Sequence, residues 1–421
     1  MQTLAQSLVM RTAMDSVSLA PIGLLLLVAC VIAIASRRVG LPYSVGLAAA
    51  GLLIALVPGA PRFMLSRDLI FNIFLPPLVF EAALQLEWGK FRRELPVTLT
   101  LALVGVGLAA FVVAAGLHYA LQWSWLGAML FGVLIAATDP VAVIAAFKEL
   151  NADRRLTMLV ESESLLNDGV VAVAFAVLAG IAGGASAGAA SVVPAFLWTL
   201  FGGALVGAVA SGLVLLLAGR TEDHLVEITL TTLAAYGSFL IAESVHASGV
   251  LASLTAGLII GNRGAKGAIS DAGRPHVLAA WEFFAFLANS FVFLLIGIEL
   301  VGVPIGTLGW ETMATAIVLV LVGRAVAVFP LSTLFRPSKL GVPLPFQAVL
   351  FWGGLRGALA LALALTVPAG VAERGPIILC AFVVVAFSIF VQGLTMPWLV
   401  GRLGLIAKPR GKRVAAARAR P

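Results

Sequence analysis

Two neighbouring apolar stretches of this chain carry acidic residues near their centres. The run 125–147 is interrupted by Thr138-Asp139-Pro140. The next run, 156–182, carries five polar residues, namely Glu161, Glu163, Ser164, Asn167 and Asp168. Acids at mid-depth in a membrane are energetically expensive and mark ion or proton pathways. Because Pro140 removes a backbone donor and breaks the helix, free carbonyl groups are expected beside Asp139. Broken backbone with nearby carboxylates predicts a cation transporter.

The depth of both acids follows from the basic residues that end each run. Asp168 lies thirteen residues after Arg155, which is about 20 Å along a helix. Asp139 lies nine residues before Lys148, which is about 14 Å along a helix. Both carboxyl groups are therefore expected in the central part of a hydrocarbon layer about 30 Å thick.

Helical spacing predicts which of these groups share a face. Ser164 and Asp168 are separated by four residues and face one way, whereas Glu163 and Asn167 form a second pair rotated by about 100°. Hard cations prefer several oxygen ligands. We expect an alkali cation to be bound by one set of oxygens, from Asp168, Asp139, Ser164 and the backbone of Thr138. A cation favours the ionised acid and burial favours the neutral one, so cation and proton compete for the same carboxyl group.

A buried arginine gives Glu163 a different role. Arg324 lies twelve residues before Arg336, about 18 Å into the membrane. A buried guanidinium stays charged and requires a partner. We expect a structural ion pair between Arg324 and Glu163, with Asn167 bonding to the same carboxylate.

Three further charged groups leave alternatives open. Arg356 follows Gly353-Gly354 at the opening of a helix, where it could cap free carbonyl groups or neutralise an acid such as Glu161. Glu81 and Glu161 could each flank a cytoplasmic funnel or contact the ion, and Glu81 could instead form a structural pair. The glycines at 353 and 354 and the proline at 140 are expected to support the broken helices.

The composition is that of a membrane protein. Of the 421 residues, 61% are hydrophobic and 11% are charged, whereas soluble domains average about 25% charged residues. The formal net charge is +7, which could suggest a nucleic-acid partner. The basic residues, however, lie in alternate short loops, a distribution that indicates the orientation of the chain in a membrane. Cys30 and Cys380 lie inside apolar runs and indicate neither a disulfide nor a metal centre. No cofactor is predicted beyond the transported Na⁺ and H⁺.

The apolar runs predict an all-α fold with thirteen transmembrane helices. They cover 17–36, 43–60, 69–88, 95–117, 125–147, 156–183, 190–218, 225–245, 248–262, 277–301, 311–334, 345–367 and 376–402. The positive-inside rule then places the N-terminus outside and the C-terminus in the cytoplasm. If helices 1–6 and 8–13 are inverted repeats, helix 5 pairs with helix 12, and both are interrupted. Residues 1–407 would form the transmembrane domain and 408–421 a basic cytoplasmic tail.

Several motifs along most of the chain resemble those of the monovalent cation:proton antiporter-1 family, the NhaP-type and sodium/proton-exchanger group. The motifs are Phe80-Glu81-Ala82-Ala83-Leu84, Ala137-Thr138-Asp139-Pro140-Val141, Glu163-Ser164-Leu165-Leu166-Asn167-Asp168, Ala256-Gly257-Leu258, Gly261-Asn262-Arg263-Gly264, Trp281-Glu282-Phe283, Leu295-Ile296-Gly297, Gly323-Arg324-Ala325 and Gly353-Gly354-Leu355-Arg356-Gly357-Ala358. Thr-Asp-Pro alone is a weak signal. Thr-Asp-Pro one helix before Glu-Ser-Leu-Leu-Asn-Asp is highly specific.

The resemblance implies a homodimer in the cell membrane, with a six-helix core that moves against a dimerisation domain. It also implies electroneutral exchange of one cation for one proton at Asp168, as part of pH homeostasis. The sequence leaves open whether Na⁺, K⁺ or Li⁺ is preferred. Two other classes remain as alternatives, an intramembrane aspartyl protease and a passive cation channel; a transporter, not an enzyme, is the prediction.

Overall fold

The computed structural model describes residues 19–39, 41–57, 66, 68–184, 188–264, 269–302 and 309–406, and within these ranges the fold is helical with no β-strand. The predicted basic tail 408–421 lies outside these ranges, as does the N-terminal segment before residue 19. The all-α prediction is confirmed.

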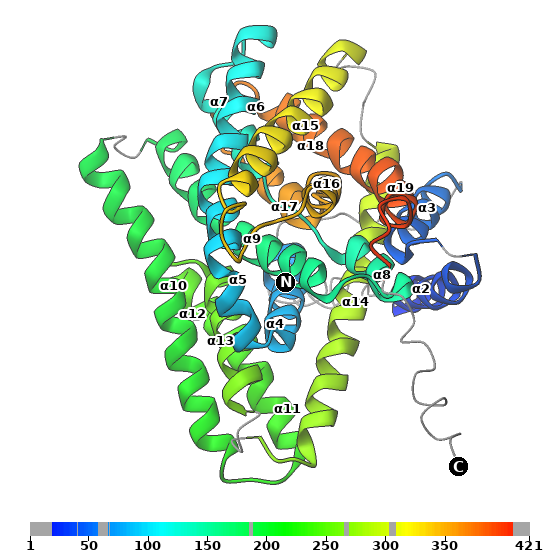
Figure 1. The fold of residues 1–421 in the computed structure, drawn as a ribbon, viewed down its shortest axis with the longest axis vertical. Helices are drawn as coiled ribbons and strands as arrows, with labels where there is room; N and C mark the ends of the chain where they lie inside the picture. Colours follow the sequence, from blue (N-terminus) through cyan, green and yellow to red (C-terminus); the bar gives the residue numbers. More distant parts are fainter. Residues whose placement is uncertain are drawn as a thin grey trace, which may run out of the picture.

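The described residues of the first part of the chain, up to residue 182, are mainly helical (Figure 1). In order they are α2 (Leu19–Val39), α3 (Tyr43–Ala55), the π-helical η1 (Leu69–Phe74), α4 (Leu75–Gln85), α5 (Trp88–Thr100), η2 (Leu101–Gly105), α6 (Val106–Leu121), α7 (Trp125–Leu134), α8 (Val141–Leu150) and α9 (Arg154–Ala182).

The second part continues in the same way from residue 189. Its elements are α10 (Ala189–Ala218), α11 (His224–Thr232), η3 (Leu233–Gly237), α12 (Ser238–Ser244), α13 (Gly249–Arg263), α14 (Gly273–Gly302), α15 (Trp310–Thr333), α16 (Leu344–Trp352), α17 (Ala358–Leu365), α18 (Arg374–Phe387), η6 (Ser388–Gly393) and α19 (Leu394–Arg402).

Each apolar run predicted from the sequence contains helical structure. In the described part of the chain, 7 helices are continuous, long and apolar enough to cross a membrane. The remaining predicted crossings are shorter helices, or are split where the chain leaves the helical path. The protein is thus a multi-pass membrane protein, while the count of thirteen crossings and the repeat relation stay predictions.

Two of the predicted crossings are broken at their centres. The chain leaves the helix after α7 and resumes with α8 at Val141, and it does the same between α16 and α17. The two breaks touch, because the backbone N–H of Asp139 donates to the carbonyl of Leu355 at 2.7 Å. Pro140 directly precedes α8, a position where its missing N–H leaves no helical bond unmade.

Several helix pairs approach closely because glycines face a neighbouring backbone. α3 packs along α14, and α13 lies between α4 and α10 (Figure 1). A Cβ on Gly51 of α3 would overlap the carbonyl of Leu294, and one on Gly297 of α14 would overlap the carbonyl of Ala48. Small residues at such contacts allow the close helix packing that is common in membranes.

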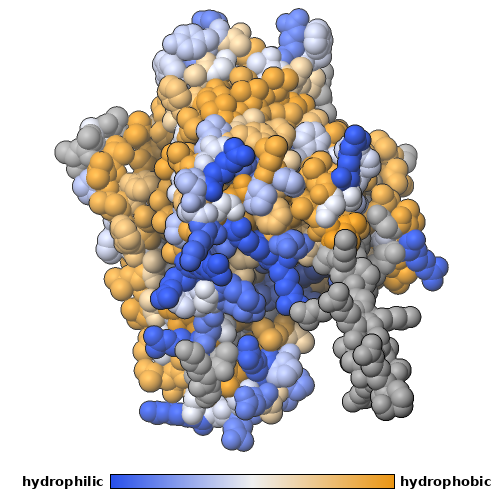
Figure 2. Space-filling view, viewed as in Figure 1, coloured by the Kyte–Doolittle hydropathy of each residue, from blue (hydrophilic) through white to orange (hydrophobic). Residues whose placement is uncertain are grey.

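The polar part of the surface is confined to limited regions. Figure 2 shows hydrophilic residues gathered in the middle of one face, over the ends of α5 and α9, with hydrophobic residues around them. The exposed basic residues Arg92, Arg93, Lys148 and Arg154 belong to this part of the chain. They are among those that predict the cytoplasmic side.

The chain beyond α19 returns to the same end of the molecule. Ala152, between α8 and α9, forms an isolated antiparallel bridge with Ile406. The N–H of Asp153 donates to the carbonyl of Leu405 at 3.2 Å. The start of α9 is therefore hydrogen-bonded to residues that follow the last helix.

Candidate functional site

The break between α7 and α8 lies directly opposite the polar face of α9. The Ser164 hydroxyl donates to the carbonyl of Thr138. Asp139 accepts a hydrogen bond at Oδ1 from the N–H of Val141, at 3.0 Å, which places a carboxylate at the N-terminus of α8. The free N–H groups and the positive end of the helix dipole favour an acid there.

Asp168 lies one turn beyond Ser164 on the same face of α9. Its Oδ1 is buried and has no hydrogen-bond partner among the described residues. A buried acceptor without a partner is uncommon and requires an explanation, such as an ion that it binds. Asp139 lines the same cavity as Asp168, and two acids that face one space favour either a shared proton or a bound cation.

A cavity of about 110 Å³ brings these groups together. Its polar lining residues come from α4, from the α7–α8 break, from α9 and from α14, and they are Glu81, Thr138, Asp139, Ser164, Asp168 and Asn289. The four residues expected to bind the cation therefore share one space. Asn289 was not among the site residues predicted from the sequence; a lone amide in the apolar run 277–301 was the available signal.

Glu163 and Arg324 form a buried, bidentate ion pair beside the cavity. Nη1 of Arg324 donates to Oε1 at 2.7 Å, and Nη2 donates to Oε2 at 3.0 Å. Nη2 also donates to the carbonyl of Leu350 in α16 at 2.9 Å. The side chain of Arg324 is only 8% exposed and that of Glu163 only 3%, so the pair that links α9, α15 and α16 is buried. A Cβ on Gly354 would lie 2.6 Å from Nε of Arg324, which explains why a glycine is needed there.

The expectation that Asn167 bonds to the Glu163 carboxylate is wrong. Its Nδ2 donates to the carbonyl of Ala136 at 2.9 Å and to Oγ1 of Thr138 at 3.2 Å. Both oxygens of Glu163 are already occupied by the arginine. The break in α7–α8 leaves carbonyl groups that need donors, and Asn167 supplies one.

Arg356 also donates hydrogen bonds to carbonyl groups in the α7–α8 break. Its Nη1 donates to the carbonyls of Ala136 and Ala137, at 2.6 and 3.0 Å. Of the two alternatives left by the sequence, the capping role is the one observed. A guanidinium at the C-terminal end of α7 also complements the negative end of that helix dipole. Gly353, at the C-terminus of α16, leaves room for the side chain of Met396.

Glu81 and Glu161 differ in their relation to the cavity. Glu81 lines it and accepts a hydrogen bond from Gln85. Glu161 is half-buried and is not among the lining residues. Lys148 and Glu161 are near enough to Glu81 to interact with its charge.

Comparisons with known proteins agree with this geometry. The family profile described as "Sodium/hydrogen exchanger, transmembrane" matches residues 24–402. The chain is 40% identical to the Na(+)/H(+) antiporter ApNhaP of Aphanothece halophytica, over 89% of this chain and 72% of that protein. It is 33% identical to the Na(+)/H(+) antiporter NhaH of Halobacillus dabanensis, over 87% of this chain and 93% of that protein.

The fold is also that of a solved structure. The sodium proton antiporter MjNhaP1 from Methanocaldococcus jannaschii superimposes with a TM-score of 0.72 at 19% sequence identity, covering 92% of this chain and 98% of that one. The relatives are named as transporters and not as enzymes. From the extent of the family match and of these identities, the chain belongs to the sodium/hydrogen exchanger family of membrane transporters.

Proposed function

We propose that this protein is an electroneutral sodium/proton antiporter of the cell membrane, in which Asp168 binds the cation and the proton alternately. One observation carries the proposal most directly. Oδ1 of Asp168 is buried without a hydrogen-bond partner in the described structure, in a cavity that Asp139, Ser164 and Thr138 also line. The named relatives are Na(+)/H(+) antiporters, which supports the same choice of ions.

The ligands suit a hard monovalent cation. The carboxylates of Asp168 and Asp139, the hydroxyl oxygen of Ser164 and the carbonyl of Thr138 are oxygen donors of the kind such ions prefer. The Ser164 hydroxyl donates a hydrogen bond to the carbonyl of Thr138, so the lone pairs of its oxygen remain available for a cation. Na⁺ bound beside Asp168 displaces its proton, and reprotonation releases Na⁺.

A single shared carboxyl group predicts that one monovalent cation is exchanged for one proton. Asn167 does not titrate, and its amide is engaged with the broken backbone. The α9 face therefore offers Asp168 alone as a shared carrier. An exchange of one Na⁺ for one H⁺ moves no net charge, so the membrane potential should not drive it.

Alternating access follows if the helices around the breaks move against the rest of the protein, in an elevator-like manner. α9, α15 and α16 are joined by the Arg324–Glu163 pair, which supports their movement as one body. The glycine contacts between α3 and α14 support a separate, rigid scaffold. We infer that this scaffold forms the homodimer, with the N-terminus outside and the C-terminus in the cytoplasm.

The test uses purified protein in liposomes with a trapped pH indicator. Addition of NaCl should move protons at a rate that is unchanged when the potential is clamped at different values. Asp168→Asn should abolish this movement, while Glu311→Gln, at an exposed acid on α15, should retain it. LiCl and KCl in parallel decide between the sodium, lithium and potassium alternatives. Normal exchange by Asp168→Asn would overturn the proposal.

A further inference from the structure

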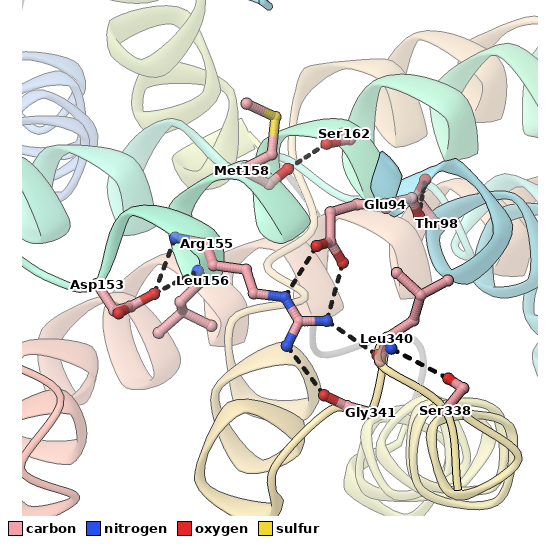
Figure 3. A network of polar contacts seen from close by, with 10 residues as sticks. All are labelled: Glu94, Thr98, Asp153, Arg155, Leu156, Met158, Ser162, Ser338, Leu340 and Gly341. Atoms are coloured by element: carbon pink, nitrogen blue, oxygen red, sulfur yellow. Dashed lines mark hydrogen bonds and ion pairs between the residues drawn. The ribbon is translucent and has the colours of Figure 1, made fainter. Parts of the chain in front are cut away.

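A second arginine–carboxylate pair holds the N-terminus of α9 (Figure 3). Nε of Arg155 donates to Oε1 of Glu94 at 2.9 Å, and Nη2 donates to Oε2 at 3.0 Å. Glu94 is on α5 and its side chain is only 8% exposed, whereas that of Arg155 is 32% exposed. This bidentate geometry gives more directional constraint than a single contact between charges.

The same guanidinium also binds the connection between α15 and α16. Nη1 donates to the carbonyl of Gly341 and Nη2 to that of Leu340, each at 2.9 Å. Figure 3 shows Arg155 between the Glu94 carboxylate on one side and these two carbonyl groups on the other. One side chain therefore connects α5 and α9 to the segment that leads into the second broken helix.

The two clamps together restrict how α9 can lie. Glu163 is eight residues beyond Arg155, so the two attachment points are about 12 Å apart along the helix. A single attachment point would allow α9 to tilt about it, whereas two at different depths fix both its tilt and its axial position. Asp168 lies about 20 Å from Arg155, near the middle of α9, so a small tilt of the helix displaces its carboxylate.

We propose that Glu94 and Arg155 are positioning residues, which set the cation affinity of Asp168 by fixing α9 against the α15–α16 connection. This inference rests on the proposed function, since it assigns to the pair an effect on the affinity of that site. Neither residue lines the cavity, so any effect on affinity must pass through α9. An exposed ion pair contributes little to stability. Here, however, Glu94 is buried, and the guanidinium of Arg155 also donates to the carbonyl groups of Leu340 and Gly341.

The experiment compares Glu94→Gln, Arg155→Met and the double variant in liposomes. Each single change should raise the sodium concentration at half-maximal rate by about fivefold, in the range reported for remote residues that modulate a site, with the maximal rate little changed. The double variant should resemble the singles, because the two side chains act as one unit. The matched control is Glu87→Gln at the start of α5, whose exposed pair with Lys90 spans 2.6 Å; it should behave as the wild type.

A second measurement does not depend on transport. Amide hydrogen exchange over residues 336–343 should become faster in both single variants and stay unchanged in Glu87→Gln. Half-maximal sodium concentrations at the wild-type value in both single variants, or additive effects in the double variant, would overturn the inference. The proposed function is tested separately, because its failure would appear as an absence of exchange in the wild type, whatever the hydrogen exchange shows.

Discussion

Gly357 provides a steric test of the crossing between the two broken helices. It directly precedes α17, and its φ of −141° is extended backbone that any residue adopts. A Cβ added there would lie 2.5 Å from Cβ and 2.8 Å from Cγ of Asp139, and it would also overlap Oδ2. Alanine at this position is therefore excluded by space and not by backbone conformation.

Asp139 cannot easily move away from such a methyl group. Its N–H donates to Leu355 at 2.7 Å and its Oδ1 accepts from Val141 at 3.0 Å. Overpacking of a well-packed site destabilises by about 1–3 kcal/mol. If this free-energy cost destabilises the sodium-bound conformation alone, Gly357→Ala should raise the half-maximal sodium concentration by about 5- to 150-fold.

The assay is sodium-driven proton movement in liposomes, measured over a range of NaCl concentrations. Gly370→Ala is the control, since no atom lies within 4 Å of a Cβ built at that glycine. Folding of both variants is checked by size-exclusion chromatography in detergent. A Gly357→Ala protein with the half-maximal sodium concentration of the wild type would refute the reasoning that crowding of Asp139 weakens sodium binding.

Three further changes test other contacts. Glu163→Gln leaves the buried guanidinium of Arg324 without its counter-charge, so thermal unfolding should show a loss of about 3–5 kcal/mol. Arg356→Met removes the donor to two carbonyl groups in the α7–α8 break and should lower the free energy of unfolding by about 1–3 kcal/mol. Arg356→Lys should lose less stability than Arg356→Met. Equal stability of the wild type and both variants would contradict the capping role. Leu251→Ala removes a buried α13 side chain that packs against Gly169 of α9 and should destabilise the protein by about 2–5 kcal/mol; thermal unfolding at the wild-type temperature would contradict a role for this contact in holding α13 to α9.

The sequence was sufficient to predict the helices and the positions of both breaks. Apolar runs predict membrane crossings because only apolar side chains are stable in contact with hydrocarbon. Proline and paired glycines predict where a helix ends. Arg324 was matched to Glu163 from depth alone, since a buried guanidinium needs a carboxylate at its own level. The structure contains this pair.

Contacts that depend on helix rotation or on loop paths were not predictable in this way. The partner of Asn167 is a carbonyl group that only the path of the α7–α8 break exposes. Asn289 reaches the cavity because of how α14 is rotated against α4. Arg155 served only to mark one edge of the membrane, because its carbonyl partners belong to a connection about 185 residues away in the chain, and no local pattern records such a distance.

The bridge between Ala152 and Ile406 has a practical consequence for following the protein at work. A fluorescent protein fused after residue 406 would be tethered beside the first turn of the helix that bears Asp168. Energy transfer from that label to a dye on α14, which packs along α3, would then test in real time whether α9 moves against the proposed scaffold.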